Sequence, residues 1–158
     1  MKVLYVARYY PTLSETFVYR EIAELQARGH QVRVLALGER ADGAMQDELP
    51  DVHVWRPPRG LGARALVGPA LRGALGAGLP EGLADWLRPK DLARIRWAAE
   101  QAAAWGAERV HTHFAGEAAE WGMGIAHLLG VSQGLTVHAV DLFKPRPSLE
   151  TLLRHARP

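Results

Sequence analysis

The sequence predicts an α/β fold: a Rossmann-like three-layer α/β/α sandwich built on a mostly parallel sheet. Short apolar runs rich in branched and aromatic residues recur along the chain, and amphipathic helical patterns alternate with them. The first run, 3–7, is apolar without interruption, which is typical of a strand buried on both faces. Because the chain has 158 residues, we expect one domain, 1–158, with a substantial core.

The first strand leads into a helix. Pro11 ends the strand because it donates no backbone hydrogen bond and restricts the residue before it. The helix can begin with Ser14 as N-cap, or with Thr12 as N-cap and Glu15 at the capping-box spacing. Its expected apolar stripe is Phe17, Val18, Ile22 and Leu25. The side chains expected to face away are Glu21, Glu24 and Arg28.

Gly29 ends this helix, and 31–37 reads as the second strand, so the opening unit is a right-handed βαβ. Later strands are expected at 51–56, 108–114 and 135–138. Later helices are expected at 90–106, 117–129 and from Ser148 to Arg157. The apolar face of the first of these is expected to be Leu92, Ile95, Ala99 and Ala103.

The segment 59–80 is dominated by Arg, Gly, Ala and Leu. Its glycines lower helix propensity, so we expect broken helical turns. One interpretation is a helical cover over the sheet, and another is a surface that meets a membrane or a lipid-linked acceptor. The first is favoured because the arginines are few and glycine dilutes the apolar face.

Composition excludes several function classes. A formal charge of +2 does not indicate nucleic acid, and the absence of cysteine excludes disulfides, thiolate metal sites and a thiol nucleophile. No apolar stretch is long enough to span a bilayer. Arg8, Glu15 and Arg20 interrupt any signal-peptide pattern. We therefore expect a cytoplasmic protein, or one peripheral at the inner face of a membrane.

Polar and aromatic side chains gather where the predicted strands end. In a parallel sheet, the carboxyl ends of the first, fourth and fifth strands meet at one edge. The residues expected there are Arg8, Tyr9, Tyr10, His113, Phe114, His138 and Asp141. His138 is either ligand-facing or structural, and Asp141 is either a site carboxylate or a turn cap. Strand alternation places His111 on the same face as His113 at another depth.

Three chemistries suit these groups. A phosphorylated or sugar-bearing ligand could meet the free amides at the helix start near 12–15. His111, His113, His138 and Asp141 form a ligand set suited to zinc hydrolysis. The metal-hydrolase interpretation is less favoured, because a strand with a His-x-His metal pair usually stands at the start of a larger barrel. A (β/α)8 barrel needs about 200 residues or more. The third possibility is a module that only binds. Dinucleotide, Walker, nucleophile-elbow and His-Glu-x-x-His motifs are absent from the sequence.

Four segments, in order along the chain, carry a family resemblance. They are Ser-Glu-Thr-Phe at 14–17, Arg-Gly-His-Gln-Val at 28–32, Val-His-Thr-His-Phe at 110–114, and Thr-Val-His-Ala-Val-Asp-Leu-Phe at 136–143. Together they resemble family 4 glycosyltransferases of the exopolysaccharide and colanic-acid type. The resemblance covers nearly the whole chain, with 59–90 the least informative part.

The resemblance implies the N-terminal half of a GT-B fold. It implies a retaining hexosyltransferase that moves a sugar from a nucleotide-sugar donor to a glycan or lipid-linked acceptor, with no cofactor beyond that co-substrate. The family's His-Gly-x-Asp stretch maps onto His138 and Asp141, the expected catalytic residues, and the histidine is expected to meet the transferred sugar. In this class the donor phosphate is thought to take the acceptor proton. The expected substrate-binding residues are Tyr9, Tyr10, Ser14, Glu15, Thr16, His113 and Phe114.

The chain departs from the family pattern in two ways. Ala139 stands where the family usually has Gly, which predicts strain if φ is positive there. The nucleotide-binding domain with its paired glutamates is absent, so we expect a truncated, acceptor-side half that is inactive alone. Its expected partner is a second copy or the missing domain. The alternatives are a non-catalytic sugar- or partner-binding subunit and, third, a metal-dependent hydrolase.

Overall fold

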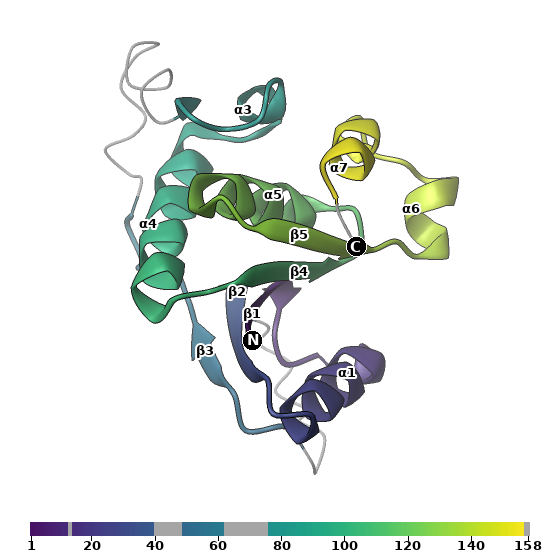
Figure 1. Cartoon of the computed structure of the whole chain (residues 1–158). Helices are drawn as coiled ribbons and strands as arrows, with labels where there is room; N and C mark the ends of the chain where they lie inside the picture. Colours follow the sequence, from purple (N-terminus) through teal and green to yellow (C-terminus); the bar gives the residue numbers. More distant parts are fainter. Residues whose placement is uncertain (13, 40–48, 62–75, 157–158) are drawn as a thin grey trace.

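A computed structural model, which describes residues 1–12, 14–39, 49–61 and 76–156, confirms the predicted α/β class (Figure 1). Within these residues, five strands form one parallel sheet in the order β3-β2-β1-β4-β5. The strands are β1 (Lys2–Tyr9), β2 (Gln31–Gly38), β3 (His53–Trp55), β4 (Arg109–His113) and β5 (Ser132–Thr136). The chain builds outward from β1 to β3, then returns to β1's other side for β4 and β5. Ligands of such sheets bind where the order reverses, at the carboxyl ends of β1 and β4.

Helices cover both faces of the sheet, so the three-layer arrangement is confirmed. The helices are α1 (Thr16–Ala27), α3 (Leu83–Trp86), α4 (Pro89–Trp105), α5 (Glu117–Leu129), α6 (Ala139–Phe143) and α7 (Leu149–His155). Figure 1 shows α4 and α5 on one face and α1 on the other. None of the described helices is long and apolar enough to cross a bilayer. Most of the predicted cover at 59–80 lies outside the described residues.

Strand alternation separates the core into two apolar clusters. Leu4 and Val6 of β1 pack with residues of α4 and α5 such as Ile95. Val3 and Tyr5 pack with Val18 and Ile22 of α1 on the opposite face. Burying a side chain such as Ile22, which is fully inaccessible, stabilises the fold by about 2 kcal/mol. The histidines of β4 share the α1 face with Tyr5.

The predicted N-cap of α1 is wrong. The N-cap is Glu15, without a side-chain capping bond, rather than Ser14 or Thr12. Thr12 is buried, and its backbone N–H and C=O both bond the hydroxyl of Tyr19. The helix therefore holds the loop before it through a tyrosine, and Thr12 Oγ1 makes no capping bond to the described residues.

Three further expectations need correction. Ala103 is exposed, and Ala98 and Ala102 are buried in its place, because they lie at i+3 and i+7 from the buried Ile95. The fifth strand ends at Thr136, so His138 lies beyond it as the N-cap of α6. The strain expected at Ala139 is absent, because Ala139 begins a helical turn after the extended residue His138.

Helix α5 approaches the sheet closely at Gly122. A Cβ at this position would lie 2.6 Å from Thr112 Cγ2 and 2.9 Å from Gln133 Nε2. Gln133 cannot move aside easily, because its Nε2 donates to Thr112 Oγ1 at 3.2 Å and to the Ala119 carbonyl at 3.0 Å. The glycine therefore sets the distance between α5 and the strands that carry the site.

We expect Gly122→Ala to destabilise the protein by about 1–3 kcal/mol, although alanine normally favours a helix. Gly124→Ala is the matched comparison, because its Cβ would meet side-chain carbons, the nearest 3.1 Å away on Ile95. Urea unfolding followed by circular dichroism measures both free energies. A Gly122→Ala protein as stable as the parent would show that α5 does not depend on this close approach.

Candidate functional site

A cleft of about 430 Å³ opens at the carboxyl ends of β1 and β4. Its lining includes Arg8, Tyr9, Glu15, His113, Phe114, Asp141, Lys144 and Arg146. A second hollow of about 470 Å³ lies beside Gly130 and the start of β5. That hollow faces the amino end of the strand, whereas ligands of parallel sheets bind at the carboxyl ends. The first cleft is therefore the candidate site.

Glu21 brings a carboxylate against the histidines beside this cleft. Its Oε1 accepts a hydrogen bond from the Tyr5 hydroxyl at 2.5 Å and lies 3.4 Å from His111 Nε2. Its Oε2 lies 3.0 Å from His113 Nε2, an ion-pair distance at which the angle is not that of a hydrogen bond. The prediction that Glu21 faces away from the sheet is therefore wrong. The strand register, which places Tyr5 beside His111, creates a polar pocket under α1 that Glu21 fills.

His113 and His138 join β4 to the segment after β5. His113 Nδ1 and His138 Nε2 lie 3.3 Å apart, within hydrogen-bonding range. The Phe114 ring stacks on His138 with centroids 4.0 Å apart, and Phe17 approaches the same imidazole at 5.0 Å. Phe17 is 37% exposed, so it borders the site and does not belong to the buried stripe predicted for it. The result is a wall of two imidazoles and two phenyl rings.

Two backbone features hold this wall in place. Phe114 has φ 65, in the left-handed region that costs a non-glycine residue on the order of 1–3 kcal/mol. The Phe114 N–H donates to the Thr136 carbonyl at 2.9 Å, which fixes the turn against β5. Asp141 accepts a hydrogen bond from the His138 backbone N–H at 2.8 Å. Asp141 thus has the cap geometry that was one of its two sequence interpretations.

Burial and the shared carboxylate shift three pKa values. The contact with His113, followed by the hydrogen bond from Tyr5, lowers the pKa of Glu21 to about 2, although burial opposes this. Burial lowers the pKa of His111 to about 4, so this imidazole is neutral at neutral pH. Burial and Glu21 together raise the pKa of Tyr5, which remains a hydrogen-bond donor.

The other predicted site residues divide into two groups. The first group lines the cleft and consists of Tyr9, Glu15, His113, Phe114 and Asp141. His138 is outside the lining, and its ring stacks on that of Phe114. Tyr10 is 6% exposed and packs edge-on against Tyr19, and burial raises its pKa to about 12. Ser14 and Thr16 are not among the lining residues. The predicted zinc set also changes, because the carboxylate beside His111 and His113 comes from Glu21 and not from Asp141.

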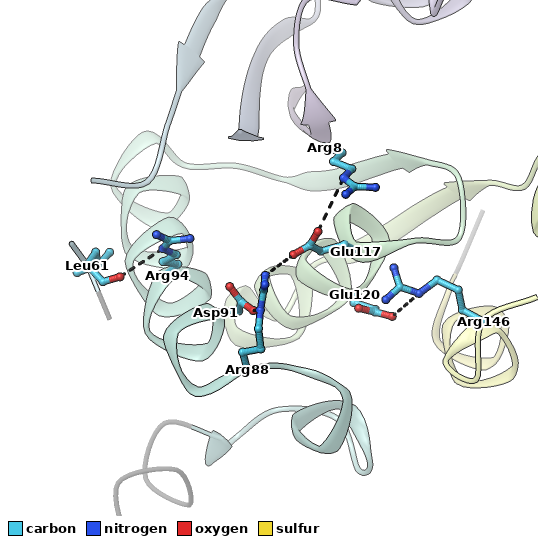
Figure 2. A network of polar contacts seen from close by, with 8 residues as sticks. All are labelled: Arg8, Leu61, Arg88, Asp91, Arg94, Glu117, Glu120 and Arg146. Atoms are coloured by element: carbon cyan, nitrogen blue, oxygen red, sulfur yellow. Dashed lines mark hydrogen bonds and ion pairs between the residues drawn. The ribbon is translucent and has the colours of Figure 1, made fainter. Parts of the chain in front are cut away.

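Ion pairs organise the rim of the cleft (Figure 2). Arg88 binds both Asp91 at 2.5 Å and Glu117 at 2.8 Å, and Arg8 lies 4.0 Å from the same Glu117. Arg146 lies 3.5 Å from Glu120, which is buried. The Ser148 hydroxyl donates to Glu120 at 2.6 Å, so the loop before α7 is tied onto α5. This tie brings Lys144 and Arg146 to the cleft, a position that their place in the sequence did not predict.

Besides Lys144 and Arg146, sequence reasoning missed Glu21 and Tyr5 as functional candidates. Glu21 lies between Val18 and Ile22, at the border of the apolar stripe, where helical periodicity alone does not decide which way a side chain faces. The available signal was the pair His111 and His113 on a strand face that α1 covers. Two imidazoles beneath a helix require a polar partner on that helix.

Comparison with known proteins supports the fold. No family model matches the chain, and no curated protein matches it. The crystal structure of the glycosyltransferase SnogD from Streptomyces nogalater is similar, with a TM-score of 0.53 at 17% sequence identity. The match covers 98% of this chain and 37% of SnogD, so the chain spans little more than a third of that neighbour.

The pKa of His111 makes stability depend on pH. The unfolded state takes up a proton near pH 6.5 and the folded state only near pH 4, so stability falls as pH drops between these values. We expect this loss to be on the order of 2–3 kcal/mol. Glu21 adds a smaller loss below pH 4.5, reduced by solvent screening because the side chain is 39% exposed.

Urea unfolding at a series of pH values measures this dependence. His111→Gln should flatten the change in unfolding free energy between pH 6.5 and 4.5, because glutamine does not titrate. His127→Gln, at an exposed position on α5, is the control and should retain the parent's slope. An unchanged slope in His111→Gln would exclude His111 as its source.

Proposed function

We propose that this chain is the acceptor-side Rossmann-like half of a GT-B glycosyltransferase of the family 4 type. The proposed reaction is retaining transfer of a sugar from a nucleotide-sugar donor to a glycan or lipid-linked acceptor. The observation that carries the proposal is the wall formed by His113, Phe114 and His138 at the carboxyl edge of the sheet. A glycosyltransferase shares the fold.

The groups around the cleft suit a sugar that bears a phosphate. Aromatic faces pack against the apolar side of a pyranose, and imidazole nitrogens offer hydrogen bonds to its hydroxyls. Arg8, Lys144 and Arg146 line the cleft and suit phosphate oxygens. Two of the lining carboxylates are already engaged: Glu117 binds Arg88, and Asp141 binds the His138 backbone. These two acids therefore oppose an anionic ligand less than their formal charges imply.

The proposal gives the residues distinct roles. His138 would contact the transferred sugar, and the donor phosphate would take the acceptor proton. His113, which lines the cleft, would contact the substrate and orient His138, and Glu21 would act as a positioning residue through His113. Tyr9 and Phe114 would contact the acceptor. Asp141 would hold the turn at His138.

We also propose that a second wall completes this site. Helix α6 exposes Val140, Leu142 and Phe143, the last by 85%. Such an apolar surface beside a cleft is suited to a covering domain. We propose a nucleotide-binding domain, in the same or a separate chain, as that cover, and a cytoplasmic or peripheral inner-membrane location. The alternative is a subunit that binds sugars without transferring them, which the same cleft would permit.

We expect His138→Ala in the complete protein to lower kcat/KM for sugar transfer by about 100-fold or more. The melting temperature should fall by only about 2–4 °C, because His138 is half-buried and its packing on Phe114 and Phe17 is a small part of the core. The assay measures transfer from a panel of nucleotide sugars to lipid-linked and free glycans, with His127→Ala as control. Full activity in His138→Ala would remove His138 from the site. Glycan binding with neither transfer nor donor hydrolysis would favour the binding subunit.

A further inference from the structure

We propose that Glu21, His111 and His113 form a site for one divalent transition metal ion, with zinc as the natural occupant. The site lies beneath α1 and is distinct from the surfaces of His138 and Phe114 proposed to meet a sugar. The proposal does not depend on glycosyl transfer.

The donor atoms already converge. One ligand atom from each residue lies within 4.8 Å of those of the other two. Both histidines direct Nε2 toward the carboxylate, at 3.4 Å for His111 and 3.0 Å for His113. Ligands bound about 2.0–2.1 Å from a tetrahedral ion lie roughly 3.3 Å from one another. The two observed separations are close to that spacing, but they involve different oxygens of Glu21, so an ion bound through one oxygen requires a rotation of the carboxylate.

His113 supplies independent support. Its side chain is 6% exposed, and its Nε2 has no aligned hydrogen-bond partner among the described residues, although Glu21 is near. Leaving a buried ring nitrogen without a hydrogen bond lowers the free energy of unfolding by an amount on the order of 1–3 kcal/mol. A metal ion would satisfy it, because coordination uses the lone pair that the carboxylate cannot accept.

Neighbouring groups orient the ligands as outer partners of metal sites do. Tyr5 donates to Glu21 Oε1 and fixes that carboxylate. His138 Nε2 lies 3.3 Å from His113 Nδ1 and can accept the proton that His113 carries there when Nε2 binds a metal. Such second partners are a regular feature of histidine ligands. Thr136 Oγ1 lies 3.3 Å from His111 Nε2, within hydrogen-bonding range, and a metal ion on Nε2 would take the place of this bond.

The ligand types select the metal. Two imidazoles and one carboxylate suit zinc and its neighbours, whereas magnesium and calcium prefer oxygen ligands. Three protein ligands leave a fourth position for water. Glu21 is 39% exposed, so solvent reaches the cluster. The ion would join α1 to β4 and stabilise the folded state through binding.

The test uses the whole chain without a histidine tag, treated with chelator and then titrated with Zn²⁺ or Co²⁺. Calorimetry and metal analysis should give one ion per chain, and Co²⁺ should give the strong visible absorption of tetrahedral coordination. Glu21→Gln, His111→Gln and His113→Gln should each lose more affinity than the about 10- to 100-fold expected on losing an outer partner. Tyr5→Phe should fall within that smaller range, and His127→Gln should bind as the parent does.

Absence of stoichiometric binding, or equal affinity in the parent and the three ligand variants, would overturn the proposal. Circular dichroism of the metal-free variants identifies any that fail to fold, and the remaining ligand variants still decide the question. None of these measurements depends on glycosyl-transfer activity. A negative result therefore leaves the proposed function intact, and loss of that function leaves this proposal intact.

Discussion

The site depends on one carboxylate that turns toward the sheet. Glu21 reaches under α1, where Tyr5 donates to one oxygen and His113 lies against the other. Without it, two largely buried imidazoles would face an apolar helix, and Thr136 and His138 would be the hydrogen-bond partners that the described residues still offer them. The contact also ties α1 to β1 and β4 through polar groups, in addition to the apolar cluster around Ile22. The imidazole wall of the cleft packs against this polar contact of Glu21 with Tyr5 and His113.

The wall of the cleft depends on the backbone conformations of Phe114 and His138. His113 belongs to a strand, whereas Phe114 leaves the sheet with positive φ and His138 follows β5 in an extended conformation. The strained turn at Phe114 places its ring against His138. Strain of this kind persists where the surroundings hold it and is common at functional sites. The ion pairs of Arg88 and Glu117 and the buried Glu120 then fix the rim on α5.

The sequence predicted the features that follow from periodicity. Apolar runs located the strands, Gly130 marked the end of α5, and alternation placed His111 and His113 on one face. Features that depend on contacts between elements were not predictable in this way. The Tyr19 hydroxyl bonds the backbone of Thr12, the N-cap of α1 falls at Glu15 and not at Thr12 or Ser14, and the packing of α4 buries Ala102 in place of Ala103. Glu21 belongs to this second group, because its direction is set by the histidines of a strand about ninety residues further along the chain.

The most direct test of the account is a double-mutant cycle between Glu21 and His113 in metal-free protein. Urea unfolding of the parent, Glu21→Gln, His113→Gln and the double variant gives the coupling free energy. We expect a coupling of about 1 kcal/mol or more, because residues in one polar network do not contribute independently. If the unfolding free-energy changes of the two single variants add up to that of the double variant within about 0.5 kcal/mol, the claim that Glu21 positions His113 is contradicted.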